Sequence, residues 1–85
     1  MKYTISIERS AQKQFERLHK DVQSRVDKKI LDLADNPRPQ GVEKLSGVDH
    51  LYRVRVGDYR IIYQIRDKEL IVLVVKIGHR REVYR

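Results

Sequence analysis

Three arginines stand close together in a segment whose residues alternate between polar and apolar. Arg53 and Arg55 precede the dipeptide Gly57-Asp58, which signals a two-residue hairpin turn, and Arg60 follows it. A hairpin with this turn places Arg55 opposite Arg60 and Arg53 opposite Ile62, all on one face of the sheet. Three guanidinium groups on one face repel one another, and a bound phosphate relieves the repulsion. The pattern therefore predicts a phosphate-binding face.

This prediction depends on the hairpin register, because a slip of one residue would send the arginines to the other face. The alternative is that the guanidinium groups are exposed, hydrated and spread apart at little energetic cost. The charge balance favours a phosphate-rich partner, since the chain has a net charge of +7 and residues 50–85 contain nine basic and four acidic side chains. Seven of those nine basic residues are arginine, which can bind a phosphate through two donors.

The C-terminal segment Gly78-His79-Arg80-Arg81-Glu82-Val83-Tyr84-Arg85 contains further groups suited to nucleic acid. We expect it to leave the last strand beside the basic face. An unperturbed histidine exchanges protons near pH ~6.5, whereas arginine is permanently protonated. A tyrosine can stack on a base or hold a hydroxyl group. His79 and Tyr84 are therefore the candidates for proton transfer, and the alternative is a frayed, solvated terminus.

Metal, cofactor and thiol chemistry have no matching pattern in the sequence. The chain has no cysteine, its acidic residues are scattered, and His19, His50 and His79 lack the spacing of metal ligands. It contains no glycine-rich phosphate loop or dinucleotide motif. We therefore predict a site without metal or cofactor. Cleavage of RNA fits this prediction, because the ribose 2′-hydroxyl can itself attack the phosphate while arginines stabilise the developing charge.

The N-terminus alternates apolar and polar residues and lacks the apolar segment of a signal peptide. The longest apolar run, residues 70–75, is too short to cross a bilayer. Together with the absence of cysteine, these features favour a cytoplasmic protein that does not engage a membrane.

The spacing of apolar residues predicts the strands and helices on which these groups lie. Strands are predicted over residues 2–7, 51–56, 59–65 and 69–77. The last is almost continuously apolar, which is typical of a central strand buried on both faces, and Gly78 is predicted to end it. Residues 38–50 contain Pro39, Gly41 and Gly47 and are predicted to form a loop.

Two amphipathic helices are predicted between the first and second strands. Ser10 is expected to cap one helix and Asp21 the other, which ends before Pro37. The order strand-helix-helix-strand-strand-strand predicts a two-layer α+β fold, a single domain over residues 1–85, with a two-helix hairpin on one face of a mostly antiparallel sheet. The other face stays open, and it is the face that carries the arginines.

The chain resembles the RelE branch of the RelE/ParE toxin superfamily over nearly its whole length. The resemblance rests on the stretches Lys44-Leu45-Ser46-Gly47, Leu51-Tyr52-Arg53-Val54-Arg55-Val56-Gly57-Asp58-Tyr59-Arg60-Ile61-Ile62-Tyr63 and Gly78-His79-Arg80-Arg81-Glu82-Val83-Tyr84. The hairpin marks the superfamily, and the tail distinguishes the RNA-cleaving branch from the gyrase-inhibiting ParE branch. The resemblance implies a type II toxin that cuts mRNA in the ribosomal A site and leaves a 2′,3′-cyclic phosphate and a 5′-hydroxyl.

The resemblance also implies the partners. These are a cognate antitoxin that blocks the toxin, the ribosome and mRNA, with DNA contacted only through the antitoxin. The alternative function is that of a non-catalytic, ParE-like inhibitor of DNA gyrase. The tail discriminates between the two, because a gyrase inhibitor has no need of His79, Arg80 and Tyr84 together.

The roles of individual residues follow from the resemblance by position. Arg60 and Arg80 match arginines that stabilise the transition state and the leaving group, and Tyr84 matches a tyrosine that positions the substrate. Arg53 and Arg55 match strand positions that are often lysine in the family. The expected catalytic residues are thus Arg55, Arg60, His79, Arg80 and Tyr84, and the expected RNA-binding residues are Lys44, Arg53, Arg81 and Arg85. Because arginine cannot act as a base and residues 51–56 contain no glutamate, the identity of the general base stays open.

Overall fold

The computed structural model describes residues 2–45 and 50–83 of the chain. The described elements, in chain order, are β1 (Thr4–Ile7), α1 (Arg9–Glu16), α2 (Lys20–Asp35), β2 (Glu43–Lys44), β3 (Leu51–Val56), β4 (Tyr59–Arg66), β5 (Ile71–His79) and α3 (Arg80–Val83). The strands form one sheet in the order β1-β5-β4-β3-β2. β1 runs parallel to β5, and the other neighbouring strands are antiparallel.

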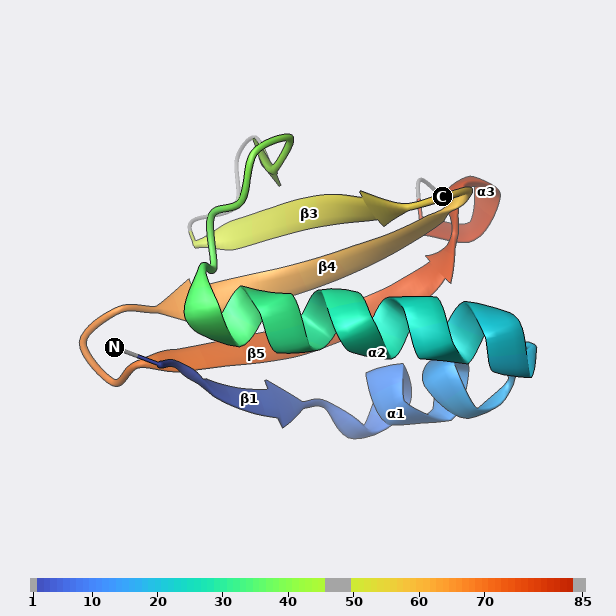
Figure 1. Ribbon diagram of the computed structural model, residues 1–85, viewed down its shortest axis with the longest axis horizontal. Coiled ribbons are helices and arrows are strands. Elements are labelled where there is room, and N and C mark those ends of the chain that lie inside the picture. Colours follow the sequence, from blue (N-terminus) through green and yellow to red (C-terminus); the bar gives the residue numbers. More distant parts are fainter. Residues whose placement is uncertain (1, 46–49, 84–85) are drawn as a thin grey trace.

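Helices α1 and α2 lie together on one side of the sheet and leave the other side without either of them (Figure 1). This arrangement confirms the predicted two-layer α+β fold, with the two helices placed between the first strand and the three that follow the loop. In the described part of the chain, no helix is long and apolar enough to span a membrane.

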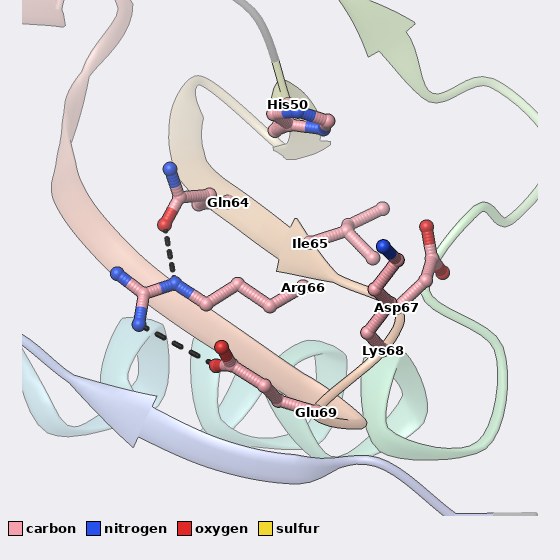
Figure 2. A pocket seen from close by; sticks show the side chains of 7 residues that line it. All are labelled: His50, Gln64, Ile65, Arg66, Asp67, Lys68 and Glu69. Atoms are coloured by element: carbon pink, nitrogen blue, oxygen red, sulfur yellow. Dashed lines mark hydrogen bonds and ion pairs between the residues drawn. The ribbon is translucent and has the colours of Figure 1, made fainter.

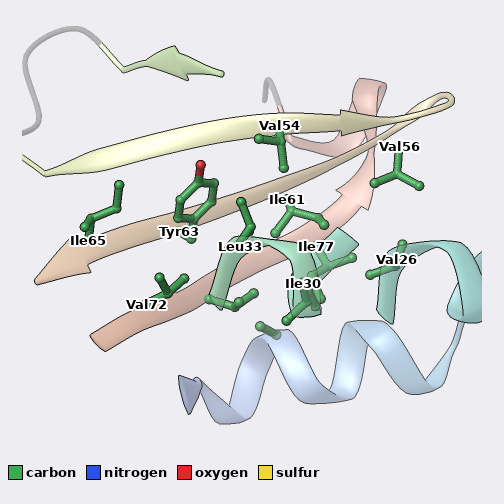
Figure 3. Close-up of a cluster of buried hydrophobic side chains, with 12 residues drawn as sticks. Val26, Ile30, Leu33, Val54, Val56, Ile61, Tyr63, Ile65, Val72 and Ile77 are labelled. Atoms are coloured by element: carbon green, nitrogen blue, oxygen red, sulfur yellow. The ribbon is translucent and has the colours of Figure 1, made fainter. Parts of the chain in front are cut away.

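The core lies between the two helices and the sheet (Figure 3). Val26, Ile30 and Leu33 follow successive turns of α2 and are buried. They meet buried residues of the central strands, among them Val54, Val56, Ile61, Tyr63, Ile65, Val72 and Ile77. The buried apolar residues of β3 and β4 are spaced two apart, because alternate residues of a strand share a face. The residues between them, including the three arginines, therefore belong to the open face.

The first helix begins one residue before the expected cap. β1 passes into α1 almost without a loop, since the Glu8 N–H still donates to the Val74 carbonyl of β5 at 2.9 Å. Glu8 takes the N-cap position with no side-chain capping bond in the described structure, and Ser10 lies inside the first turn. The prediction that Ser10 caps this helix was wrong because sheet pairing, and not a capping side chain, decides where the helix starts.

The second helix also starts earlier than predicted. His19 is its N-cap residue, again without a side-chain capping bond among the described residues, and Asp21 lies in the first turn. The capping role predicted for Asp21 was therefore wrong. A carboxylate in the first turn is still favourable, because it faces the positive end of the helix dipole.

The last strand is shifted by two residues from its prediction, since it runs from Ile71 to His79 and not from 69 to 77. Leu70 adopts a φ of +56° and donates to the Asp67 carbonyl at 3.3 Å, so it belongs to the turn. Gly78 continues the pairing with β4 and does not end the strand. β5 lies between β1 and β4, but it is not buried throughout on both faces, since Ile71 and Leu73 on the open face are half-buried while Val72 and Val74 on the helix side are buried.

Two segments that were expected to lack regular structure contain short elements. Within the predicted loop of residues 38–50, β2 pairs with β3 and extends the sheet; residues 46–49 lie outside the described residues. The C-terminal segment, for which a frayed terminus was the alternative, contains α3, whose first residue, Arg80, donates its N–H to the Asp58 carbonyl at 2.8 Å. Both elements are too short to show the repeating spacing of apolar residues by which helices and strands are recognised in a sequence.

Three polar side chains tie the segment before β2 to the turn between β4 and β5. Arg38 donates two hydrogen bonds to the Asp67 carboxylate, at 3.1 and 2.9 Å, and the Tyr3 hydroxyl donates a third at 2.7 Å. The Arg38 guanidinium also lies 5.3 Å from the centre of the Tyr52 ring, as in a cation–π contact. The hydrogen bonds from Arg38 and Tyr3 lower the pKa of Asp67 to about 2. An ionised Asp67 thus helps to hold the segment that leads into β2.

Replacing Asp67 with asparagine is expected to remove part of the acid sensitivity of the fold. A carboxyl group whose pKa is lower in the folded protein stabilises it fully above the unfolded pKa, near ~4, and loses that contribution as the pH falls toward the folded pKa of about 2. Asp67→Asn should therefore be less stable than the unsubstituted chain at neutral pH, with a difference that shrinks as the pH falls. Urea unfolding at several pH values measures this, and a pH-independent difference would contradict it.

Candidate functional site

The hairpin of β3 and β4 has the register that its turn predicts. Arg55 pairs with Arg60, and Arg53 pairs with Ile62. Gly57 occupies the turn with a φ of +60°, a conformation that favours glycine. The three arginines therefore share the open face of the sheet, as expected.

Arg60 is not the exposed, hydrated arginine of the alternative interpretation. The residue is only 6% exposed, and its Nη1 donates to the carbonyl oxygens of Gly57 and Tyr59, at 3.1 and 3.0 Å. Its cross-strand partner on β5 is Gly78, which has no side chain to fill the space beside the guanidinium. Among the described residues, its buried Nε has no hydrogen-bond partner. Arg60 is thus a cation held in place by the turn carbonyls, with one buried donor that has no partner among the described residues.

Glu43 and Lys76 extend the charged surface of the open face, and neither was predicted. Glu43 pairs with Arg53 across β2 and β3, and the Arg53 guanidinium donates a hydrogen bond to its carboxylate. That bond, followed by the charges of Arg55 and Arg60, lowers the pKa of Glu43. Lys76 pairs with Ile62 across β4 and β5 and so shares the face of Arg53. A two-residue strand and a β-bulge decide these positions, and neither has a recognisable sequence signal.

His79 lies away from the arginines. It pairs with Tyr59, whereas Arg60 pairs with Gly78, so His79 and Tyr59 share the helix-covered face. The rings of His79 and Tyr59 meet edge to face, with centres 5.6 Å apart, and the Arg81 N–H donates to His79 Nδ1 at 3.3 Å. His79 also lines a cavity of about 380 Å³ with Gln14 and other residues of the α1 side. The expectation that the tail brings His79 to the basic face was wrong.

The remaining predicted site residues lie at different places. Arg80 and Arg81 are exposed in α3, which starts at the hairpin turn close to Arg60. Lys44 pairs with Tyr52, so it is on the helix side of the sheet edge and does not join Arg53. Tyr84 and Arg85 lie outside the described residues.

A cavity of about 520 Å³ lies at the end of β4 that leads into the turn toward β5 (Figure 2). His50 and residues 64–69 line it, and none of them is a predicted site residue. Arg66 donates to Gln64 Oε1 at 2.8 Å and forms an ion pair with Glu69 at 3.6 Å. Arg66 is thus paired with a carboxylate that lines the same cavity.

The open face can bind and stabilise negative charge at phosphorus. Arg55 and Arg60 lie directly opposite each other, and Arg53 and Lys76 flank them in the next row. Guanidinium groups bind the non-bridging oxygens of a phosphate and favour the extra charge of a five-coordinate intermediate. Within residues 2–45 and 50–83, no three His, Asp or Glu side chains form a group that could hold a metal ion.

Comparison with known proteins shows that this chain is similar to toxins in sequence and in fold. Residues 5–84 match the family model described as the ParE toxin of type II toxin-antitoxin systems. A RelE-like toxin protein of Escherichia coli is 33% identical over 94% of this chain and 85% of its own length. The mRNA interferase toxin RelE of Escherichia coli K12 is 30% identical over 99% of this chain and 92% of its own length. A chain of the intact E. coli RelBE toxin-antitoxin complex is 26% identical, with a TM-score of 0.81 over 91% of this chain and 95% of that chain.

Proposed function

We propose that this chain, which belongs to the family of ParE toxins of type II toxin–antitoxin systems, is a RelE-type toxin. Such a toxin is an endoribonuclease that cleaves mRNA in the ribosomal A site and so inhibits translation. The observation that carries the proposal is Arg60, a buried arginine with an unpartnered Nε, facing Arg55 across the hairpin. The similarity to an mRNA interferase over 99% of this chain supports it.

The RNA and the protein supply every atom that the reaction needs. The ribose 2′-oxygen bonds to the adjacent phosphorus, the bond from phosphorus to the 5′-oxygen breaks, and the products are a 2′,3′-cyclic phosphate and a 5′-hydroxyl. Arg55 and Arg60 stabilise the charge that builds up on the non-bridging oxygens. Arg80, exposed at the start of α3, is proposed to stabilise the leaving oxygen, and Tyr84 to stack on the substrate. His79 faces the other side of the sheet, so we assign it no proton transfer.

RNA binding is proposed for the cations around this centre, which are Arg53, Lys76, Arg81 and Arg85. Lys44 lies at the sheet edge on the helix side and is proposed to contact RNA outside the reaction centre. The ribosome orients the mRNA for in-line attack, which accounts for a site with few groups that can carry protons.

A cognate antitoxin is the proposed inhibitor, by analogy with the RelBE toxin-antitoxin complex to which the chain is structurally similar. An acidic, amphipathic segment would suit the basic open face and the half-buried Ile62 on it. DNA is contacted only through that antitoxin, and the proposed location is the cytoplasm, where the ribosomes are.

Primer extension on a defined mRNA tests the proposal. The purified protein is incubated with the mRNA alone, with programmed ribosomes, and without ribosomes in the presence of EDTA. Cuts within the A-site codon that appear only with ribosomes are expected. Arg80→Ala serves as the inactive control, because Arg80 is exposed and its substitution should leave the fold intact.

Intact mRNA in every lane, with folded protein, would contradict the nuclease proposal. The alternative is then the ParE-like inhibition of DNA gyrase, which the description of the matching family model favours. A supercoiling assay with purified gyrase decides between the two, since an mRNA interferase is expected to leave supercoiling unchanged.

A further inference from the structure

Glu43 is the carboxylate that β2 brings to the row of arginines. It faces Arg53 across the pairing of β2 with β3, and Arg53 donates a hydrogen bond to its Oε2. The charges of Arg55 and Arg60 reach the same carboxylate and, after Arg53, contribute to lowering its pKa. The side chain is 48% exposed, so a substrate can contact it. An accessible, ionised carboxylate therefore lies beside the groups that are proposed to bind the scissile phosphate.

Other groups that could take a proton are poorly suited or wrongly placed. Arginine stays protonated at any physiological pH. Lys76 shares the open face, but a lysine ordinarily carries its proton at neutral pH and can only donate it. His79 lies on the helix side of the sheet. Lys44 lies on that same side, because it pairs with Tyr52. Glu43, by contrast, has carboxylate oxygens that can accept a proton, and it lies directly across from Arg53.

We propose that Glu43 is the general base of the cleavage reaction, a role that rests on the proposed function. The carboxylate takes the proton of the 2′-hydroxyl while that oxygen forms its bond to phosphorus. The bond from phosphorus to the 5′-oxygen breaks, its electron pair leaves with that oxygen, and solvent protonates it. Glu43 then returns its proton to solvent, so atoms and charge balance over the cycle. Arg53 holds the carboxylate, while Arg55 and Arg60 hold the phosphate next to it.

The arginines have two opposite effects on such a base. They keep Glu43 ionised, so that all molecules are ready to accept a proton at neutral pH, and they make the carboxylate a weaker acceptor. Fixed placement beside the reacting hydroxyl compensates for that weakness, because proximity converts proton transfer into a step within one complex. A positioned base typically contributes about 10²–10⁴-fold to the rate.

This assignment predicts a distinct dependence of the cleavage rate on pH. Protonation of Glu43 removes the base, so the rate should rise with pH through a pKa below the usual glutamate range and be flat at neutral pH. The charged groups around Glu43 are Arg53 and Arg55 on β3, Arg60 on β4 and its neighbour Lys44 on β2.

Single-turnover cleavage on programmed ribosomes, with toxin in excess, tests the assignment between about pH 6.5 and 8.5. Glu43→Gln keeps an oxygen that can accept the Arg53 hydrogen bond but cannot take a proton. We expect it to slow cleavage by at least about 10²-fold and to make the remaining rate rise about tenfold per pH unit, as hydroxide replaces the base. Glu43→Asp should recover part of the rate together with the flat profile.

Glu69→Gln is the matched control. Glu69 is also an exposed carboxylate paired with an arginine, Arg66, at 3.6 Å, but it lies at the opposite end of the sheet. Its substitution changes the net charge by the same amount and should leave both the rate and its pH profile unchanged.

Two results would overturn the assignment. One is a Glu43→Gln variant that cleaves as fast as the unsubstituted chain. The other is a slow variant that keeps the flat profile, because Glu43 would then act only by holding Arg53. If the unsubstituted chain cleaves no mRNA on ribosomes, the proposed function itself fails, and the base assignment fails with it.

Discussion

Arg60→Ala is expected to lower ribosome-dependent mRNA cleavage by about 10²–10³-fold, the loss that accompanies removal of one fixed donor from a site that stabilises developing charge. The Arg60 guanidinium is already held by the carbonyl oxygens of Gly57 and Tyr59 before any substrate arrives. A group fixed in this way does not need to reorganise as charge builds up on the phosphate. Its Nε is buried and has no hydrogen-bond partner among the described residues.

The same substitution also affects the turn, and the experiment has to separate the two effects. Arg60→Ala removes two hydrogen bonds to the backbone of the hairpin, at a cost of about 1–2 kcal/mol in the free energy of unfolding. Arg60→Lys keeps the charge but loses the planar fork, so it should keep the fold and recover only part of the rate. Cleavage rates and urea unfolding should be measured on both variants.

Arg66→Ala is the control for charge alone. Arg66 lies on the same strand and the same face as Arg60, but its partners are Gln64 and Glu69 at the other end of β4. We expect its substitution to leave the cleavage rate unchanged. An equal loss in Arg66→Ala would indicate that general positive charge, and not a site at Arg60, determines the rate. An Arg60→Ala variant that is folded and fully active would disprove the proposed centre.

Tyr63→Ala is expected to reduce the free energy of unfolding by about 3–5 kcal/mol, as for other large aromatic residues removed from a core. Tyr63 is fully buried on β4, and its ring stacks on that of Tyr52 with centres 6.1 Å apart. Its hydroxyl donates to the Pro37 carbonyl at 2.7 Å and so attaches the end of α2 to the sheet. Since small domains are stable by only about 5–15 kcal/mol, the variant should be close to unfolding at 37 °C.

Tyr63→Phe separates the hydroxyl from the ring. It should cost only about 1–3 kcal/mol, because the ring still fills the core while the Pro37 carbonyl loses its donor. Leu31→Ala is the surface control, since Leu31 is 59% exposed and its substitution should change stability by less than about 0.5 kcal/mol. Equal unfolding midpoints in urea for Tyr63→Ala and Leu31→Ala would contradict the core assigned here.

The hairpin that carries the site could be predicted from the sequence because local chemistry decides its register. Gly57 adopts the positive φ of a tight turn, and alternation on both sides then assigns every side chain to a face. The two amphipathic helices were predicted for a similar reason, since apolar residues repeat at helical spacing in each. The first residues of these helices were not predicted correctly, because contacts with the sheet, and not capping side chains, decide where the helices begin.

The position of His79 could not be obtained by counting residues. Its strand is joined to β4 through the turn at residues 66–70, and the ladder shifts by one residue between Ile62 and Tyr63. Each such shift exchanges the two faces for every residue beyond it. His79 therefore faces α1, although the pattern of the tail favoured a place beside the arginines.

The arginine-rich hairpin could be predicted from local features alone, namely period-two alternation, a turn of the right type and a family resemblance that covers the whole hairpin. The groups that surround its arginines depend on tertiary contacts. It buries Arg60 against the turn carbonyls, brings Glu43 beside Arg53 through a two-residue strand, and sends His79 to the helix side. The physical reason is range: turn type and alternation act between neighbours in the chain, whereas burial and strand pairing join residues that are distant in it.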